Sequence, residues 1–126
     1  MEELEKKLLN IGGDKVVECA YEPHLDSLLS EGRLMNPSTV EVISAGEMSQ
    51  CHRNCAQIFL ARDENFEDSD KVEIGSGWGL SGGMWRQHTW LVINDDKIIE
   101  TTVERDKYYG ITLEGEEAEK FAFKNT

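Results

Sequence analysis

The sequence predicts one α+β domain spanning residues 1–126, with N-terminal helices packed on an antiparallel β-sheet. Its 126 residues provide for a single hydrophobic core and leave no room for a second. Apolar residues recur at helical spacing in the first half of the chain, whereas the second half alternates β-rich segments with turn residues. Helices followed by a run of sequential strands are typical of the α+β class.

Four segments show the apolar spacing of an amphipathic helix. They are residues 2–10, 23–30, 49–61 and 114–124. Gly12-Gly13 is predicted to end the first helix, and Gly32 stands where a C-cap of the second would lie. Ser49 is predicted to cap the third helix, which makes Cys51 part of its first turn.

The expected strands are separated by polar turns. They cover residues 39–43, 84–93, 97–103 and 108–113, and a further strand starts at residues 71–74. Asn94-Asp95-Asp96 is predicted to form the turn of a hairpin. The acidic run from Asp63 to Asp70 lacks the glycine and the glutamate that an EF-hand calcium loop requires at fixed positions, so we expect a solvated loop.

The charge balance excludes several classes of partner. The chain has 25 acidic and 13 basic side chains, and its net charge of −12 is spread over both halves. Such a surface repels nucleic acid and anionic membranes. No apolar run reaches the roughly 20 residues of a membrane helix, and the beginning of the chain lacks the features of a signal peptide. The 3 cysteines do not form a disulfide framework, so we expect a cytoplasmic protein with reduced thiols.

Residues 75–94 break this composition because they contain no acidic side chain, and we call them the acid-free segment. The segment holds all 3 tryptophans and 5 of the 11 glycines. Glycines permit close backbone approach and tryptophans supply rigid apolar walls, which favours the rim of a pocket. The alternative is that Trp85 and Trp90 are core residues of a strand and that the glycines mark bulges.

Cys51 is the candidate nucleophile. The N–H groups and the dipole at a helix N-terminus stabilise a thiolate, and such a cysteine also needs a base, usually a histidine. We assign this role to His88, which begins a β-rich run in the acid-free segment, because His52 points about 100° away from Cys51 around the helix. Glu100, on the partner strand of the hairpin, is the candidate group that orients the imidazole.

This pattern resembles the transglutaminase-like branch of the papain-type cysteine enzymes. The matching residues are Cys51, His88 with Trp90, and Glu100 with Thr102. The resemblance implies a transglutaminase-like or papain-like single domain with Cys51 as nucleophile, His88 as base and Glu100 as orienting acid, and it implies no cofactor. Residues 85–90, followed by residues 100–102, also resemble a family of small bacterial proteins with no assigned activity.

The hairpin register decides whether Glu100 shares a face of the sheet with His88. A two-residue turn at Asp95-Asp96 puts Glu100 on the face opposite His88. A three-residue loop at residues 95–97 restores the shared face and places Glu104 opposite His88. Glu104 is therefore the rival orienting acid.

Acyl transfer also requires hydrogen-bond donors for a developing oxyanion. We expect the backbone N–H of Cys51 to be one donor and a side chain to be another. The candidate side chains are Gln50, Gln87 and the indoles of Trp78 and Trp85. Arg86, the one arginine of the acid-free segment, is the candidate for pairing with a substrate carboxylate or phosphate. Exposed polar side chains without a role are the alternative interpretation for Gln50, Gln87 and Arg86.

The expected activity is that of a cysteine-dependent hydrolase or acyltransferase, which attacks an amide, ester or thioester of a small molecule or peptide. One alternative is a non-catalytic domain of the same fold that binds a small molecule or peptide. Another is a zinc-binding domain with ligands from Cys51, Cys55 and His88, although their spacing departs from structural zinc knuckles. The family usually has aspartate in place of Glu100 and alanine in place of Cys55, so the alternatives stay open.

Overall fold

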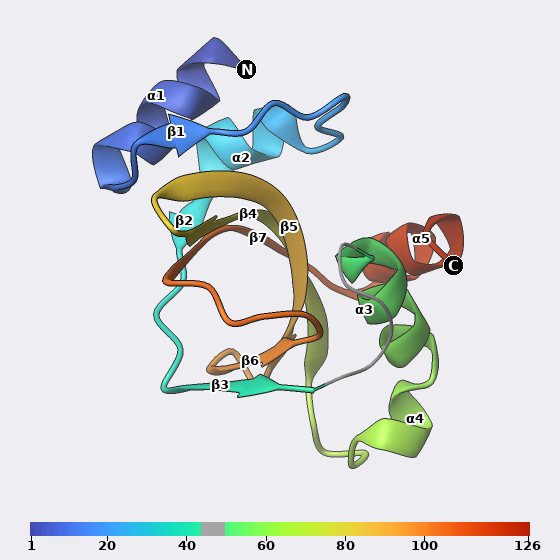
Figure 1. The fold of residues 1–126 in the computed structure, drawn as a ribbon. Coiled ribbons are helices and arrows are strands. Elements are labelled where there is room, and N and C mark those ends of the chain that lie inside the picture. Colours follow the sequence, from blue (N-terminus) through green and yellow to red (C-terminus); the bar gives the residue numbers. More distant parts are fainter. Residues whose placement is uncertain (44–49) are drawn as a thin grey trace. The chain divides into compact units, whose positions relative to one another are not determined.

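The computed structural model describes residues 1–43 and 50–126 (Figure 1). Its elements are α1 (Glu2–Ile11), β1 (Lys15–Val16), α2 (Leu25–Glu31), β2 (Arg33–Leu34), β3 (Thr39–Val42), α3 (Cys51–Leu60), α4 (Arg62–Asn65), β4 (Val72–Ser81), β5 (Met84–Ile93), β6 (Lys97–Glu100), β7 (Lys107–Leu113) and α5 (Gly115–Lys124). These helices and strands confirm the predicted α+β class. Within the described ranges, no helix combines the length and the apolar character that crossing a bilayer requires.

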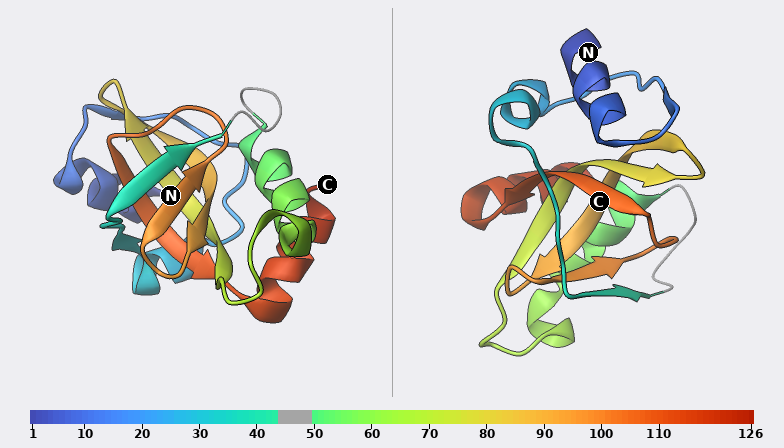
Figure 2. Two further views of the ribbon diagram at one scale, coloured as in Figure 1. Left: turned by 90° about the horizontal axis from the view of Figure 1, so that it is seen from below. Right: turned by 90° about the vertical axis from the view of Figure 1, so that its left-hand side faces the viewer.

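The seven strands found in the described residues form one open, mostly antiparallel sheet. Hydrogen bonding follows the order β2-β7-β4-β5-β6-β3, and β1 pairs additionally with β5. The pairs β2–β7 and β5–β6 are antiparallel, whereas β1–β5 and β3–β6 are parallel. Strand β3 runs beside β6 in each view of Figure 2. The sequence does not predict β1 and β2, because two residues are too few to show an alternating pattern.

Contacts divide the chain into two compact units. Unit 1 comprises Met1–Met35, Ser76–His88 and Arg105–Ile111. Unit 2 comprises Asn36–Gly75, Thr89–Glu104 and Thr112–Thr126. Strands β4, β5 and β7 contribute residues to both units, and the boundary along β5 falls between His88 and Thr89.

In unit 1, α1 confirms the helix predicted for residues 2–10. Its leucine stripe is buried, with Leu4 and Leu8 both at 0% exposure. Its first turn carries three glutamates, which interact favourably with the positive end of the helix dipole. The helix ends where the Gly12 N–H donates to the Leu8 carbonyl at 3.2 Å.

The second predicted helix begins later than expected, at Leu25 instead of Pro23, and Gly32 is its C-cap, as predicted, with a backbone N–H that donates to the Leu28 carbonyl at 3.1 Å. Gly32 has a φ of −59°, which any residue can adopt. A Cβ atom at Gly32 would lie 2.4 Å from the Leu28 carbonyl oxygen and 2.5 Å from the Tyr109 hydroxyl. Glycine is therefore required here because the chain passes too close to Tyr109 for a side chain.

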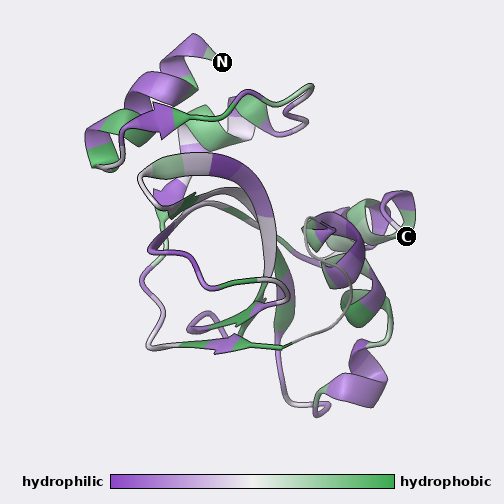
Figure 3. Ribbon diagram, viewed as in Figure 1, coloured by the Kyte–Doolittle hydropathy of each residue, from purple (hydrophilic) through white to green (hydrophobic). Residues whose placement is uncertain are grey.

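In unit 2, α3 and α5 pack against each other and confirm the helices predicted at residues 49–61 and 114–124, with ends shifted by one or two residues. Both ribbons carry hydrophilic and hydrophobic stretches (Figure 3). The predicted cap Ser49 lies outside the described residues. The prediction of a loop over the whole acidic run is wrong at its start, where α4 forms. The sequence does not predict this helix because four residues are too few to show an amphipathic period.

The β5–β6 hairpin differs from both predicted registers. Ile93 pairs with Lys97 and Leu91 with Ile99, so the loop consists of residues 94–96. Asn94 and Asp95 have φ values of 53° and 61°, in the left-handed region that Asn and Asp tolerate better than most residues. The predicted turn Asn94-Asp95-Asp96 is thus confirmed. Both predicted registers started the loop at Asp95, one residue too late, because the sequence does not reveal this left-handed pair.

The tryptophans of the acid-free segment are core residues, as the alternative interpretation held. Trp78, Trp85 and Trp90 are all at 0% exposure. Within unit 2, a Cβ atom at Gly75 would lie only 2.1 Å from Nε1 of Trp90. The absence of a side chain at Gly75 thus makes room for the indole.

We predict that Gly75→Ala destabilises the fold by about 1–3 kcal/mol, because the added methyl group overlaps the Trp90 ring and overpacks the core. The measurement is the free energy of unfolding in urea. Gly12→Ala is the matched control, since its Cβ atom would lie 3.6 Å from the nearest atom, Cδ2 of Leu80, which is an ordinary van der Waals contact. Equal losses in the two variants would contradict the prediction.

Candidate active site

Cys51 is the first residue of α3 and is partly exposed. The first helical hydrogen bond runs from the Asn54 N–H to the Gln50 carbonyl at 2.8 Å, and the side chain of Gln50, which is exposed, does not cap the helix. The first turn contains no acidic residue, whereas the first turns of α1 and α5 do. No carboxylate of this turn therefore opposes the formation of a thiolate at Cys51.

Cys55 lies one turn further along α3 and is fully buried. Burial raises the pKa of its thiol strongly, and the charges of Cys51 and Glu100 raise this pKa further, while a hydrogen bond with Thr101 opposes them. These interactions place Cys51, Cys55 and Glu100 near one another within unit 2. Cys55 is consequently a protonated core residue.

Glu100 is fully buried at the end of β6. Its Oε2 atom accepts hydrogen bonds from the Thr102 backbone N–H at 3.0 Å and from the Thr102 hydroxyl at 2.9 Å. The Glu-x-Thr motif is thus a local device that fixes the carboxylate. Glu104 is exposed and lies beyond the end of β6, and the register that favoured it as the rival orienting acid does not form.

His88 is buried on β5, at 1% exposure. Within unit 1, its ring faces the Tyr108 ring, with the centroids 6.1 Å apart and an interplanar angle of 33°. The Tyr108 hydroxyl in turn accepts a hydrogen bond from the Arg105 backbone N–H at 3.1 Å. Contacts with a second buried aromatic ring thus restrict the orientation of the imidazole.

His52 has a role that the sequence did not reveal. Within unit 2, its Nδ1 atom is hydrogen bonded to the hydroxyl of Thr89, which is fully buried on β5. The rings of His52 and Phe121 of α5 form an edge-on pair, with centroids 6.0 Å apart and an interplanar angle of 76°. Because 37 residues separate His52 from Thr89, no motif spacing could have predicted this pair.

Three of the predicted substrate-binding donors are engaged by the chain itself, all within unit 1. The Trp78 indole and the Gln87 amide both donate to Oε1 of Glu22, at 3.0 and 3.1 Å, and the Trp85 indole donates to the Gly12 carbonyl at 2.9 Å. Glu22 is buried, and sequence patterns do not reveal it because nothing in its local sequence marks it as a buried acid. Arg86 is exposed on β5.

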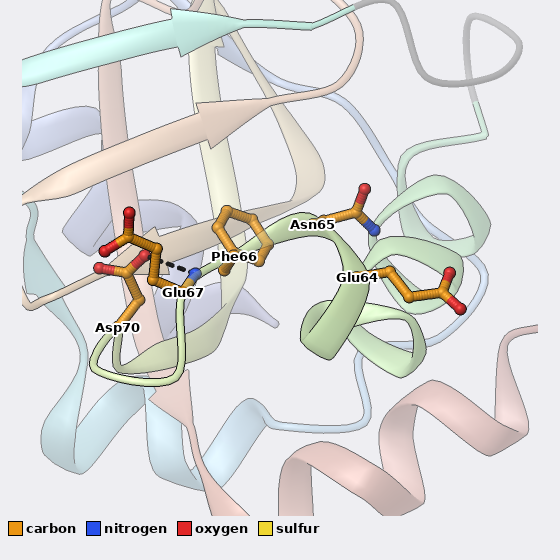
Figure 4. Close-up of a pocket in the computed structure, with 5 residues that line it drawn as sticks. All are labelled: Glu64, Asn65, Phe66, Glu67 and Asp70. Atoms are coloured by element: carbon orange, nitrogen blue, oxygen red, sulfur yellow. Dashed lines mark hydrogen bonds between the residues drawn. The ribbon is translucent and has the colours of Figure 1, made fainter.

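The acidic run borders an open hollow of about 560 Å³, which is lined by Glu64, Asn65, Phe66, Glu67 and Asp70. The Glu64 side chain points away from those of Glu67 and Asp70 (Figure 4). Asp70 accepts hydrogen bonds from the Glu67 backbone N–H at 3.1 Å and from the Asn94 amide at 2.9 Å, so it stabilises the local turn. In the described part of the chain, no three side chains are grouped as ligands for a metal ion.

Comparisons of the chain with models of protein families, with curated proteins and with solved structures find no match. The function is therefore inferred from the chemistry of its own residues. Of the predicted triad, Cys51 and Glu100 belong to unit 2, and His88 is the last residue of its segment in unit 1.

We predict that Thr102→Val lowers the free energy of unfolding by about 1–2 kcal/mol at pH 7, because it deletes one hydrogen bond to a buried carboxylate and keeps the backbone bond. Urea unfolding measures the loss. Thr112→Val, a change of the same chemistry in β7, is the control. A stability loss no larger than that of the control would refute the proposed support of Glu100.

The raised pKa of Cys55 predicts a pH signature. The unfolded thiol ionises near its ordinary value of 9.0, whereas the buried native thiol keeps its proton. The stability that the buried Cys55 thiol contributes is fully present below the pKa of the thiol in the unfolded chain, and it decreases as the pH rises above that pKa. Between pH 9 and pH 10, we expect the free energy of unfolding to decrease by about 1 kcal/mol more in the wild type than in Cys55→Ala. Urea unfolding at each pH measures it. Parallel losses would show that Cys55 ionises in the native state.

Proposed function

We propose that this chain is a cysteine-dependent hydrolase or acyltransferase with a transglutaminase-like or papain-like architecture. Cys51 is the nucleophile, His88 the base and Glu100 the acid that orients the imidazole. The thiolate attacks the carbonyl carbon of an amide, ester or thioester, and the imidazolium returns the proton to the leaving group as the acyl-enzyme forms. Water or an amine then releases the acyl group from the sulfur, and His88 accepts its proton.

The observation that carries this proposal is the hydrogen bond between His52 and Thr89. Cys51 precedes His52 in the chain, and His88 precedes Thr89. Consecutive Cα atoms are about 3.8 Å apart. The bond therefore joins the immediate neighbours of the proposed nucleophile and the proposed base, which are 37 residues apart along the chain.

Local electrostatics support the roles of Cys51 and Glu100. Cys51 lies in a first turn without acidic side chains, although the chain carries 25 of them. Thr102 holds the Glu100 carboxylate in place through Oε2. A carboxylate held in this way fixes the tautomer of a histidine and stabilises its protonated form.

A non-catalytic domain that binds a small molecule or a peptide is the second candidate. The observation that favours it is the engagement of Trp78 and Gln87 by Glu22, because both donors were expected to serve an oxyanion. Catalysis then has to draw its oxyanion donors from other groups, of which the backbone N–H of Cys51 is the first. Thiol reactivity distinguishes the two candidates.

We predict that iodoacetamide alkylates Cys51 about 100-fold faster than Cys19 at pH 6, because only an activated cysteine is largely ionised there. Burial and the charge of Glu22 raise the pKa of Cys19, which makes it a slow internal reference. Cleavage after Lys and Arg places Cys19, Cys51 and Cys55 on three different peptides, so mass spectrometry measures each rate separately. His88→Ala is expected to slow the alkylation of Cys51 at least tenfold, because the substitution removes the proposed base.

His24→Ala is the matched control, because His24 belongs to unit 1 at the start of α2 and has no part in the proposed reaction. Equally slow alkylation of all three cysteines would favour the binding domain over the enzyme. A near-stoichiometric zinc content that is lost in Cys51→Ser would contradict both candidates.

A further inference from the structure

The bond between His52 and Thr89 has an unusual position in the fold. Thr89 is at 0% exposure, and its hydroxyl is a polar group inside the core of unit 2. A buried hydroxyl is stable only when it is hydrogen bonded, and here the partner is the Nδ1 atom of His52. The contact with Phe121 holds the same ring from another element, α5. The imidazole of His52 is thus fixed at two points.

We propose that His52 and Thr89 form a positioning pair within unit 2, which fixes the first turn of α3, and with it Cys51, against the part of β5 that begins at Thr89. This inference rests on the proposed function. His52 is a positioning residue because its Nδ1 atom is committed to Thr89 and its ring to Phe121. Removal of the bond lets the first turn of α3 shift relative to the strand.

A shift of this kind has a chemical consequence that a loss of stability does not have. A cysteine beside a protonated imidazole has a lowered pKa, and it returns toward its ordinary pKa of about 8.5 when the pair is separated. A displacement of the reacting groups by about 1 Å can cost two orders of magnitude in rate. The pH profile of Cys51 alkylation therefore reports the positioning directly, provided that the protein is folded throughout.

The experiment compares full pH profiles of Cys51 alkylation in the wild type, Thr89→Val, Thr89→Ser and His52→Phe. Valine matches the shape of threonine without its hydroxyl, and phenylalanine keeps an aromatic ring beside Phe121 without its nitrogen atoms. For both we expect the profile to shift upward by about one pH unit, with about tenfold slower alkylation at pH 6. Thr89→Ser restores the hydroxyl and is expected to restore the profile. Thr112→Val, a strand threonine outside the proposed site, controls for the loss of a hydroxyl.

The outcomes separate this inference from the proposed function. The positioning pair would be overturned if His88→Ala slows the alkylation of Cys51 but folded Thr89→Val leaves its pH profile unchanged. The proposed enzyme function would then still stand. A wild-type Cys51 that reacts no faster than Cys19 would overturn both. Proton–nitrogen NMR of the unmodified protein gives a test without substitution: we expect one fixed tautomer for His52, and a ring that exchanges between tautomers would overturn the inference.

Discussion

The structure depends on the burial of residues 88–93 of β5, which are buried on both faces of the strand. This strand pairs with β4, β6 and β1, and Trp85 and Trp90 are fully buried on it. The buried polar side chains of this strand must find partners inside the protein, whereas Arg86, near its start, is exposed. Thr89 is bonded to His52, and His88 faces the ring of Tyr108. The polar residues of β5 thus determine which elements pack around it.

The parts of the fold that follow from local pattern were predictable. Helices α1, α3 and α5 each extend over ten residues, long enough for an apolar period to appear, and β5 matched its predicted bounds at both ends. The four-residue helix α4 and the two-residue strands β1 and β2 are too short for such a pattern. The hairpin register depends on the left-handed conformations of Asn94 and Asp95, which their composition permits but does not dictate.

The candidate site shows the same division between local and distant information. Cys51 at a helix start and Glu100 beside Thr102 can be recognised from short sequence motifs. Glu22 bonds to Trp78 across 56 residues, and such a pairing depends on how the whole chain folds. The acid-free segment shows how composition can mislead: its tryptophans suggested a pocket rim, but they fill the core.

The charges around Cys55 provide a physical argument for a cation in the proposed triad. Cys51 and Glu100 both raise the pKa of Cys55 and are therefore close to the same buried sulfur. A thiolate at Cys51 and the carboxylate of Glu100 repel each other, and burial strengthens this repulsion because little water screens it. The net charge of −12 offers no general excess of cations to offset it. A cation near these two anions would convert this repulsion into two attractions, and such an arrangement favours an ionised nucleophile near neutral pH.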